Sequence, residues 1–302
     1  MTAEIDHKAF LASLPAARRN ALIKRSNRHG LVHLTLFWGL MLGLGILVYF
    51  RVPGWPLLML PLGICIIFNF TLAHECTHQT PFKSRPINEL VGHISGALVF
   101  VPFLWFRAFH LAHHRHTNDP MRDPEIKDAP RPEGWSDYLW HLLGLTTWWG
   151  QLSGTLGRAF GRIDCSYVGK SARVKILVEA IIHVCFYMLI VFSSLKLSTE
   201  ILILWIIPAI LGQPFLRLYL LAEHGRCPEV VNMFENTRTV FTTRVVRFLA
   251  WNMPYHVEHH TFPQVPFYLL PEFHEDVQAH LKITSEGYPA FHRAYIQGFE
   301  AG

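Results

Sequence analysis

The chain has 302 residues, enough for one large domain or two small ones. Hydrophobic residues make up 51% of the chain and charged residues only 16%, whereas soluble globular domains carry roughly 25% charged residues. The apolar and aromatic content excludes intrinsic disorder, and five scattered cysteines without a C-x-x-C pair argue against a disulfide scaffold. The composition therefore indicates a membrane protein, with 19 histidines that a membrane anchor alone does not explain.

Membrane-spanning helices are predicted in two pairs. A span needs about 20 mostly apolar residues to cross roughly 30 Å of hydrocarbon. Four segments meet this condition, at residues 31–50, 55–73, 176–195 and 201–222. The first pair is divided at Arg51, beside the turn-forming sequence Val-Pro-Gly-Trp-Pro, and the second pair by the short link 196–200. The sequence therefore predicts two helical hairpins.

The distribution of basic residues predicts how the hairpins are oriented. Residues 1–30 and 158–175 are rich in lysine and arginine, whereas the two hairpin tips hold only Arg51 and Lys196. Because basic residues are retained on the cytosolic side, both termini and the long middle segment are expected there. The net charge of +5 follows from this bias. Nucleic-acid binding is not expected, because the sequence has no basic stripe interleaved with stacking aromatic residues.

Two weaker apolar stretches, residues 90–109 and 139–152, contain histidine, glycine and tryptophan. We expect helices that lie at the membrane interface, where tryptophan is favoured, although a spanning role stays open. The predicted fold is thus an all-α integral membrane protein that forms a single domain over residues 1–302. It has four transmembrane helices in two hairpins and a cytosolic helical cap, formed by residues 74–175 and 223–302.

Many of the histidines lie in three short clusters. The clusters are His74-Glu-Cys-Thr-His78, His110-Leu-Ala-His113-His114-Arg-His116 and His256-Val-Glu-His259-His260. Positions i, i+3 and i+4 share one face of a helix, so the imidazoles of each cluster can point the same way. Eight converging imidazoles exceed the about four to six ligands that one metal takes, which indicates two metals. A ninth candidate ligand is His224, where the fourth span ends.

The first cluster also fits H-E-x-x-H, in which two histidines bind zinc and the glutamate activates water. An intramembrane zinc protease is disfavoured, because a catalytic zinc takes three protein ligands and the other two clusters would have no role. A metal transporter is disfavoured because transporters place ionisable ligands near the membrane midplane, whereas these clusters lie at span ends or in the cap. An imidazole-rich set suits iron with positions open for oxygen, and reduced di-iron with oxygen can attack the unactivated C–H bonds of lipid chains.

The order of the three histidine boxes, H-x-x-x-H, H-x-x-H-H and H-x-x-H-H, resembles the membrane fatty acid desaturase and hydroxylase superfamily. A hairpin before the first box and two spans between the second and third agree with it. So do the sequences His-Leu-Ala-His-His-Arg-His-Thr-Asn-Asp-Pro and Asn-Met-Pro-Tyr-His-Val-Glu-His-His-Thr-Phe-Pro. The resemblance covers about residues 30–280 and implies a cap that holds two non-haem iron ions. The implied iron ligands are His74, His78, His110, His113, His114, His224, His256, His259 and His260.

Neighbours of these ligands could orient the imidazole N–H groups, as an outer layer of hydrogen-bond partners does in many metal sites. The candidates are Glu75, Asp119, Glu223, Asn252 and Glu258. Asn252 could also act as a ligand through a water molecule. No catalytic residue beyond the metal ligands and this outer layer is expected.

The resemblance implies oxygen as co-substrate and hydrogen abstraction from unactivated C–H bonds, which gives a double bond in a desaturase or an alcohol in a hydroxylase. A fatty acyl or acyl-lipid chain is favoured because the site is fed from the bilayer, while a smaller amine or amino-acid derivative stays open. Two electrons must come from outside, since the sequence has neither C-x-x-C pairs nor a flavin or dinucleotide fingerprint. A separate ferredoxin, rubredoxin or cytochrome is therefore expected, and the basic residues at 158–175 could steer an acidic donor.

Overall fold

The computed structural model describes residues 5–128 and 131–299, in which helices joined by loops are accompanied by one two-stranded sheet. In the first half of the chain the helices are α1 (His7–Ser13), α2 (Ala16–Leu22), α3 (Asn27–Tyr49), α4 (Trp55–Ile67), α5 (Asn69–His78), α6 (Arg85–Leu98), α7 (Phe103–His116), α8 (Pro124–Asp128), α9 (Trp135–Leu143) and α10 (Leu145–Ala159). In the second half they are α11 (Lys170–Lys196), the π-helical turn η1 (Leu202–Ile206), α12 (Ile207–His224), α13 (Met233–Asn236), α14 (Arg244–Leu249), α15 (His256–Thr261), the 3₁₀ turn η2 (Phe267–Leu269), α16 (Leu270–Val277), the 3₁₀ turn η3 (Gln278–His280) and α17 (Tyr288–Gln297). Strands β1 (Thr239–Val240) and β2 (Thr284–Ser285) pair in parallel.

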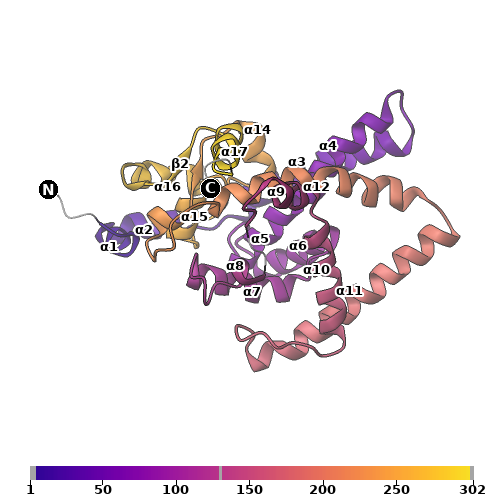
Figure 1. Cartoon of the computed structure of the whole chain (residues 1–302), viewed down its shortest axis with the longest axis horizontal. Coiled ribbons are helices and arrows are strands. Elements are labelled where there is room, and N and C mark those ends of the chain that lie inside the picture. The colour runs from indigo at the N-terminus through magenta and orange to yellow at the C-terminus, as the bar shows by residue number, and fades with distance from the viewer. Residues whose placement is uncertain (1–4, 129–130, 300–302) are drawn as a thin grey trace.

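Within residues 5–128 and 131–299, four helical segments are long and apolar enough to cross a membrane, and each overlaps one of the four predicted spans. They are Ala16–Tyr49, Trp55–His78, Lys170–Lys196 and Leu202–His224. The all-α architecture with four membrane helices is therefore confirmed. Figure 1 shows α4, α11 and α12 projecting toward the right of the view, while α15, α16 and β2 gather toward the left.

The hairpin tips lie where the sequence predicts them. Gly54, at the first tip, has a φ of +81°, a left-handed conformation that costs glycine little. The guanidinium of Arg51 donates to the carboxylate of Glu200 at 2.7 Å. Because Glu200 lies in the link between the third and fourth spans, this ion pair joins one hairpin tip to the other.

The second and fourth spans approach closely because two glycines face each other. A Cβ on Gly63 would lie 1.9 Å from the carbonyl oxygen of Pro208, and a Cβ on Gly212 would lie 2.4 Å from the carbonyl carbon of Gly63. Small residues allow this close approach of membrane helices. The contact fixes α4 and α12 beside each other, and with them the histidines at the ends of α5 and α12.

The two weaker apolar stretches each form two helices, where the sequence suggested one. Residues 90–109 are divided between α6 and α7, which meet at 98°. Pro102 precedes α7, and proline breaks a helix because it lacks a backbone N–H and clashes with the preceding turn. Residues 139–152 are divided between α9 and α10 at Gly144, whose φ is +65°.

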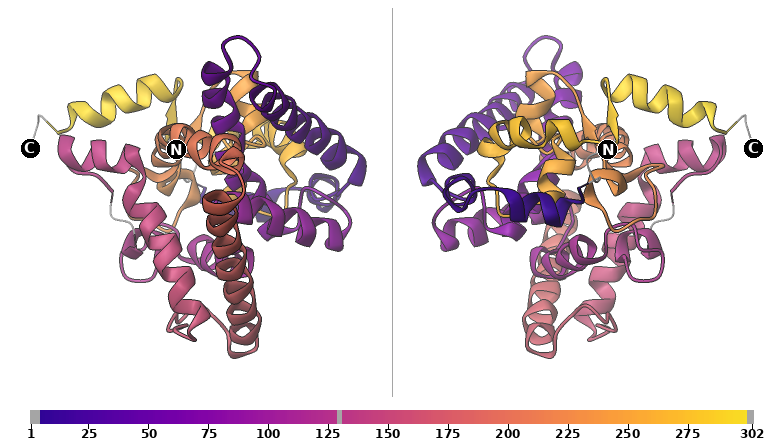
Figure 2. Two further views of the ribbon diagram at one scale, coloured as in Figure 1. Left: turned by 90° about the vertical axis from the view of Figure 1, so that its right-hand side faces the viewer. Right: turned by 90° about the vertical axis from the view of Figure 1, so that its left-hand side faces the viewer.

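The other helices surround one main hydrophobic core. Buried members come from α1, α5, α7, α15 and α16, for example Phe10, Leu72, Phe106, Val257 and Phe273. Arg18 of α2 pairs with Asp276 of α16 at 2.8 Å, which ties the N-terminal helices to the C-terminal part of the chain. The first turns of α11 contact this core through Ile176. Beyond them α11 leaves the core at an angle, with α10 beside it (Figures 1 and 2).

Candidate metal centre

Four helical elements bring the predicted ligands to one place. The first box lies in the last turns of α5, and His224 is the last residue of α12. The second box occupies the last two turns of α7, and the third box forms most of α15. The nine predicted ligands converge there in two groups of ring nitrogens.

The first group contains five histidines, and their facing ring nitrogens all lie within 4.8 Å of one another. Its members are His74, His78, His110, His114 and His259. The closest contacts join Nε2 atoms: His78 to His110 at 2.8 Å, and His114 to His259 at 3.1 Å. Since His78 and His114 are only half-buried, this group is accessible from the protein surface.

The second group is entirely buried. His113, His224 and His260 have ring nitrogens within 4.8 Å of one another. Nε2 of His256 lies 3.1 Å from Nε2 of His224, which in turn lies 3.2 Å from Nε2 of His113. The second group is therefore a set of four imidazoles.

Helix geometry explains how the boxes divide between the two groups. Members i and i+4 of a box share a group: His74 with His78, His110 with His114, and His256 with His260. The i+3 members, His113 and His259, join the other group. With 3.6 residues per turn, i+4 lies about 40° to one side of i, and i+3 about 60° to the other side. The second and third boxes can therefore each serve both groups.

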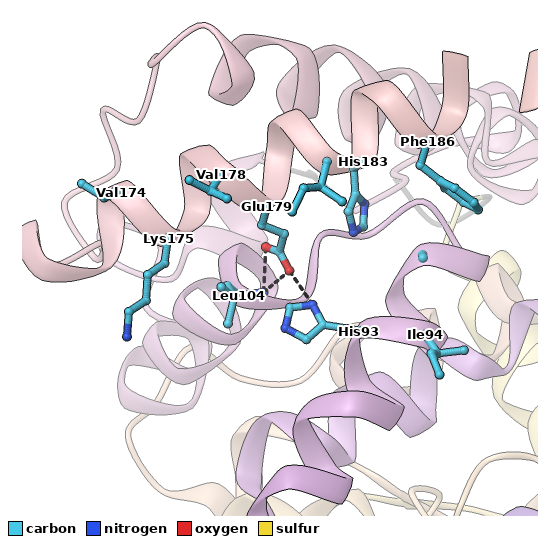
Figure 3. Close-up of a pocket in the computed structure, with 11 residues that line it drawn as sticks. His93, Ile94, Leu104, Val174, Lys175, Val178, Glu179, His183 and Phe186 are labelled. Atoms are coloured by element: carbon cyan, nitrogen blue, oxygen red, sulfur yellow. Dashed lines mark hydrogen bonds and ion pairs between the residues drawn. The ribbon is translucent and has the colours of Figure 1, made fainter. Parts of the chain in front are cut away.

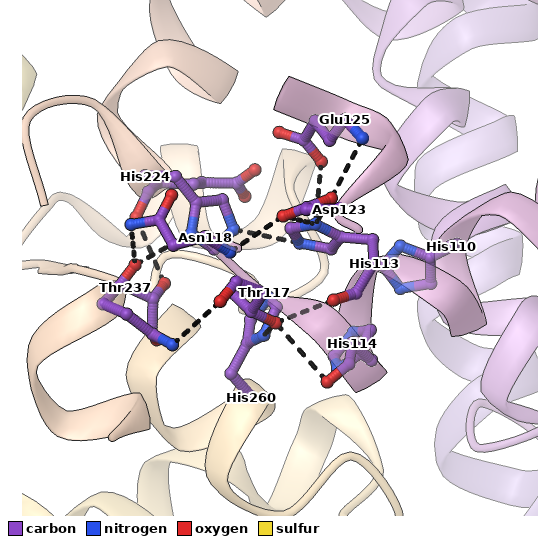
Figure 4. A network of polar contacts seen from close by, with 12 residues as sticks. His110, His113, His114, Thr117, Asn118, Asp123, Glu125, His224, Thr237 and His260 are labelled. Atoms are coloured by element: carbon purple, nitrogen blue, oxygen red, sulfur yellow. Dashed lines mark hydrogen bonds and ion pairs between the residues drawn. The ribbon is translucent and has the colours of Figure 1, made fainter. Parts of the chain in front are cut away.

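Hydrogen bonds on the far side of the rings fix the orientation of the second group (Figure 4). Nδ1 of His113 lies 3.0 Å from both carboxylate oxygens of Asp123, which is fully buried. Nδ1 of His224 donates to the carbonyl oxygen of Asn236 at 3.3 Å. When Nδ1 carries the proton, Nε2 keeps its lone pair, so both rings present a ligand atom to the group.

The ring of His260 is fixed by a hydroxyl. The Thr117 hydroxyl donates to the carbonyl oxygen of His113 at 2.9 Å, so its oxygen is free to accept from Nδ1 of His260 at 3.2 Å. Nε2 of His260 is buried and has no hydrogen-bond partner among the described residues. This nitrogen is thus a further ligand atom for the second group.

Two buried glutamates lie beside other ligand rings. Oε1 of Glu223 is 3.3 Å from Nδ1 of His256. Oε1 of Glu75 is 3.7 Å from Nδ1 of His259 and 3.9 Å from Nδ1 of His74. Both glutamates therefore stand where sequence analysis expected them, next to candidate ligands and outside the two groups.

Burial favours the neutral form of the histidines in the third box. It lowers the pKa of His256, His259 and His260 well below the usual value, and positive charge on neighbouring histidines lowers the pKa further. Neutral imidazole is the form that binds metal. Imidazole nitrogens suit iron, zinc, copper or nickel, whereas magnesium and calcium require oxygen ligands. The residues present therefore fit two transition-metal ions.

The expectation for Asp119 is corrected by the structure. Its carboxylate accepts the Arg122 guanidinium at 2.6 Å and the backbone N–H of Met121 at 2.9 Å, so it is engaged in a surface turn. Asp123, four residues further on, takes the position beside His113. Sequence spacing alone does not distinguish these two aspartates.

Two other predicted neighbours bond away from the groups. Glu258 accepts the hydroxyl of Thr239 at 2.5 Å and pairs with His274. The amide of Asn252 donates to the carbonyl oxygen of Phe267 at 3.0 Å. Glu258 thus anchors α15 to β1 and α16, and Asn252 fixes the chain just before the third box.

Sequence analysis missed Asp123, Thr117 and Asn236. Thr117 and Asp123 are close to the second box in sequence, but the conformation of the turn between them determines which histidines they contact. Asn118 has a φ of +61°, and its N–H donates to Asp123 at 2.8 Å. Asn236 is distant from the second box in sequence, and the fold brings it to the site. Its side-chain amide donates to the carbonyl oxygen of Thr117 at 3.3 Å.

Comparison with known proteins gives a consistent result. The family model described as fatty acid desaturase matches residues 52–291. A dihydrorhizobitoxine desaturase of Bradyrhizobium elkanii is 27% identical over 72% of this chain and 65% of its own length. An sn-1 oleoyl-lipid 12-desaturase of Anabaena variabilis is 26% identical over 78% of this chain and 59% of its own length.

A shorter match is closer in identity. An sn-1 acyl-lipid omega-3 desaturase (ferredoxin) of Nostoc sp. (strain 36) is 30% identical over 34% of this chain and 32% of its own length. The chain therefore spans less than two thirds of the length of each of these three relatives. The family match begins at the first hairpin tip and includes all three histidine boxes. On this match, the chain belongs to the fatty acid desaturase family.

Proposed function

We propose that this protein is an oxygen-dependent di-iron desaturase that removes hydrogen from an unactivated acyl chain. The observation that carries the proposal is the division of nine histidines into a group of five and a group of four. One zinc site of a protease would use three protein ligands and leave six of the nine without a role.

Each group would hold one iron. The ligands of the first iron would be His74, His78, His110, His114 and His259, and those of the second would be His113, His224, His256 and His260. When bound, the two irons would supply oxygen chemistry: reduced oxygen becomes an oxidant strong enough to break an unactivated C–H bond. One oxygen molecule, two external electrons, two protons and the two hydrogens of the substrate balance as one double bond and two waters.

The chain's own residues hold and shield this chemistry. Asp123, Asn236 and Thr117 keep three imidazoles of the second group with Nε2 directed inward. Burial of that group excludes water, which protects a reactive centre from side reactions. His78 and His114 are the least buried members of the two groups, and an approach to the metals would lie on their side.

The relatives support a class of substrate and a type of electron donor. An acyl-lipid chain is supported by the activities for which the Anabaena and Nostoc proteins are named, and by the four membrane helices. A ferredoxin-type donor is supported by the Nostoc protein alone, with a rubredoxin or cytochrome as the alternative. The excess of basic residues at 1–30 and 158–175 supports a metal centre and termini on the cytosolic side.

A smaller substrate is the second candidate. The Bradyrhizobium protein acts on dihydrorhizobitoxine according to its name and matches 72% of this chain. This match is longer than that of the Nostoc acyl-lipid enzyme and similar in length to that of the Anabaena enzyme. The two candidate functions use the same metal centre and differ in the substrate that is oxidised there.

Product analysis tests the proposal. Purified protein is supplied with ferrous iron, oxygen, reduced ferredoxin and either an acyl lipid or a smaller amine or amino-acid derivative. Desaturation yields a product two hydrogen atoms lighter than the substrate. A product one oxygen atom heavier would establish a hydroxylase, and a single bound zinc without oxygen-dependent turnover would contradict the proposal of a di-iron desaturase.

Ligand variants test the site itself. His113→Ala and His259→Ala are each expected to lose iron and turnover while the protein still inserts into the membrane. His116→Ala is the matched control, because it removes a histidine of the same helix that belongs to neither group. Full turnover in either ligand variant would contradict the assignment.

A further inference from the structure

A groove of about 680 Å³ lies between α6, the start of α7 and the first half of α11 (Figure 3). Its walls are mostly aliphatic and aromatic, with Ile94 on α6 and Val178, Ile182 and Phe186 on α11. The three α11 side chains are 39–59% exposed, so the fold leaves them uncovered. Because α11 is one of the four membrane helices, lipid is the medium that borders this groove.

Two polar contacts join α11 to α6, and they bound the middle of the groove. At one end Nδ1 of His93 lies 3.0 Å from the carboxylate of Glu179. At the other end the Tyr187 hydroxyl donates to the carbonyl oxygen of Ala97 at 3.1 Å. These contacts hold the two helices at a fixed separation, and the apolar groove lies along the side chains between them.

The groove is separate from the metal centre. Leu104 of α7 lines the groove, and His113 of the same helix belongs to the second histidine group. Nine residues, or about two and a half helical turns, separate them, so they face opposite sides of α7. A molecule in the groove therefore has α7 between itself and the histidines, and is not placed for oxidation.

Charge is distributed unequally along the groove. The Lys175 side chain stands at the end nearest the start of α11 and makes no hydrogen bond or ion pair with any residue that the structure describes. Glu179, one turn further, is buried, and its carboxylate is turned away from Lys175: both oxygens accept the backbone N–H of Leu104, at 3.0 and 2.9 Å, and one of them also contacts His93, so the exposed charge at this end is that of Lys175. The opposite end, at Phe186, is apolar. The groove thus has one cationic end and one hydrophobic end.

We propose that this groove binds a membrane lipid with a negatively charged headgroup, as a site distinct from the substrate site. The phosphate contacts the Lys175 ammonium, and one acyl chain lies along α11 toward Phe186. From residue 175 to residue 186 the helix rises about 16 Å, a length that accommodates a large part of an acyl chain. The bound acyl chain fills the gap between α6 and α11. It thereby steadies α11 against α7, the helix that carries the second box.

Native mass spectrometry tests this proposal without any turnover. The purified protein is incubated in detergent with equal amounts of phosphatidylglycerol and phosphatidylcholine, and the lipids retained per chain are counted. We expect the wild type to retain one phosphatidylglycerol in preference to phosphatidylcholine. In Lys175→Glu we expect this retention to fall at least fivefold. Arg173→Glu is the matched control, since it makes the same charge change two residues away, outside the groove.

A second pair of variants tests the apolar part. Ile182→Trp fills the groove and is expected to abolish retention of both lipids. Leu189→Trp makes a similar change at an equally exposed position of α11 outside the groove, and is expected to retain lipid as the wild type does. Unchanged secondary structure in all four variants, measured by circular dichroism, excludes misfolding as the cause.

Two outcomes would overturn the proposal. Equal loss in Lys175→Glu and Arg173→Glu would reduce the effect to general surface charge, and wild-type retention in Ile182→Trp would place the lipid elsewhere. Neither readout depends on metal or product. Failure of the lipid site and failure of the proposed desaturase activity are therefore distinguished.

Discussion

Single hydrogen bonds behind the imidazoles decide which ring nitrogen faces the metal centre. His113 shows this most clearly, because Asp123 accepts its Nδ1–H and is itself fixed by the backbone N–H groups of Asn118 and Glu125, at 2.8 and 2.9 Å. A buried carboxylate that is held in this way has one orientation and imposes one tautomer on the ring. Asp123 is therefore a positioning residue for the second histidine group.

Replacement of this carboxylate by an amide is expected to weaken metal binding. Asp123→Asn keeps the size of the side chain but removes a strong acceptor from His113, and loss of such a partner typically costs 10- to 100-fold in metal affinity. After dialysis against a weak chelator, iron per chain measured by mass spectrometry should fall toward half, since the first group is untouched. Asp119→Asn is the control, because Asp119 bonds Arg122 at the surface. An equal loss of iron in both variants would contradict this role.

At the scale of whole elements, breaks in helices place the boxes. The second span divides into α4 and α5 at Phe68, and the buried side chain of Asn69 bonds the groups near the break. Its amide donates to the carbonyl oxygens of Cys65 and Ile66 at 3.0 and 3.1 Å, and its oxygen accepts the indole N–H of Trp38 at 2.9 Å. Asn69 thus links the first two spans at the helix that carries the first box.

An apolar replacement of Asn69 is expected to destabilise the protein. Asn69→Leu leaves the Trp38 N–H and the carbonyl groups without their partner in an apolar environment, and each unsatisfied buried group costs about 1–3 kcal/mol. The unfolding temperature in detergent should fall, and iron content should fall with it because α5 holds two ligands. Thr71→Val is the comparison, since it removes one hydroxyl that bonds the Phe68 carbonyl at 2.8 Å, and should cost less. An unfolding temperature of Asn69→Leu at or above that of Thr71→Val would refute this account.

The elements that the sequence predicts well are those set by local pattern. Apolar length gives the four spans, and the turn sequence at Gly54 gives the first hairpin. Spacing of i, i+3 and i+4 brings the eight box histidines into consideration together, and the end of the fourth span adds His224. Spacing does not reveal that His113 and His259 cross to the other group, because that depends on where the neighbouring helices stand. Contacts such as His224 with Asn236 depend in the same way on the complete fold.

At the scale of the whole molecule, the metal centre lies where segments distant in sequence meet. The ends of α5 and α12 belong to different hairpins, while α7 and α15 lie outside the hairpins. The hairpins are joined to each other by the close contact of Gly63 with Gly212 and by the ion pair of Arg51 with Glu200. The two histidine groups form a further connection, between the ends of these hairpins and helices α7 and α15. Two metal ions bound there would act as cross-links among four helices.

Metal removal is therefore expected to lower the stability of the whole protein. A ligand that binds only the folded state stabilises it by about 2.7 kcal/mol when its free concentration is 100 times its Kd, so two ions under such conditions contribute roughly 5 kcal/mol. The unfolding temperature in detergent should be clearly lower after chelation and should return when ferrous iron is added. The double variant His113→Ala and His259→Ala, which lacks one ligand in each group, should unfold at the lower temperature with or without chelator. If chelation removes the iron and leaves the unfolding temperature of the wild type unchanged, the metals do not join these helices and the ligand assignment loses its structural basis.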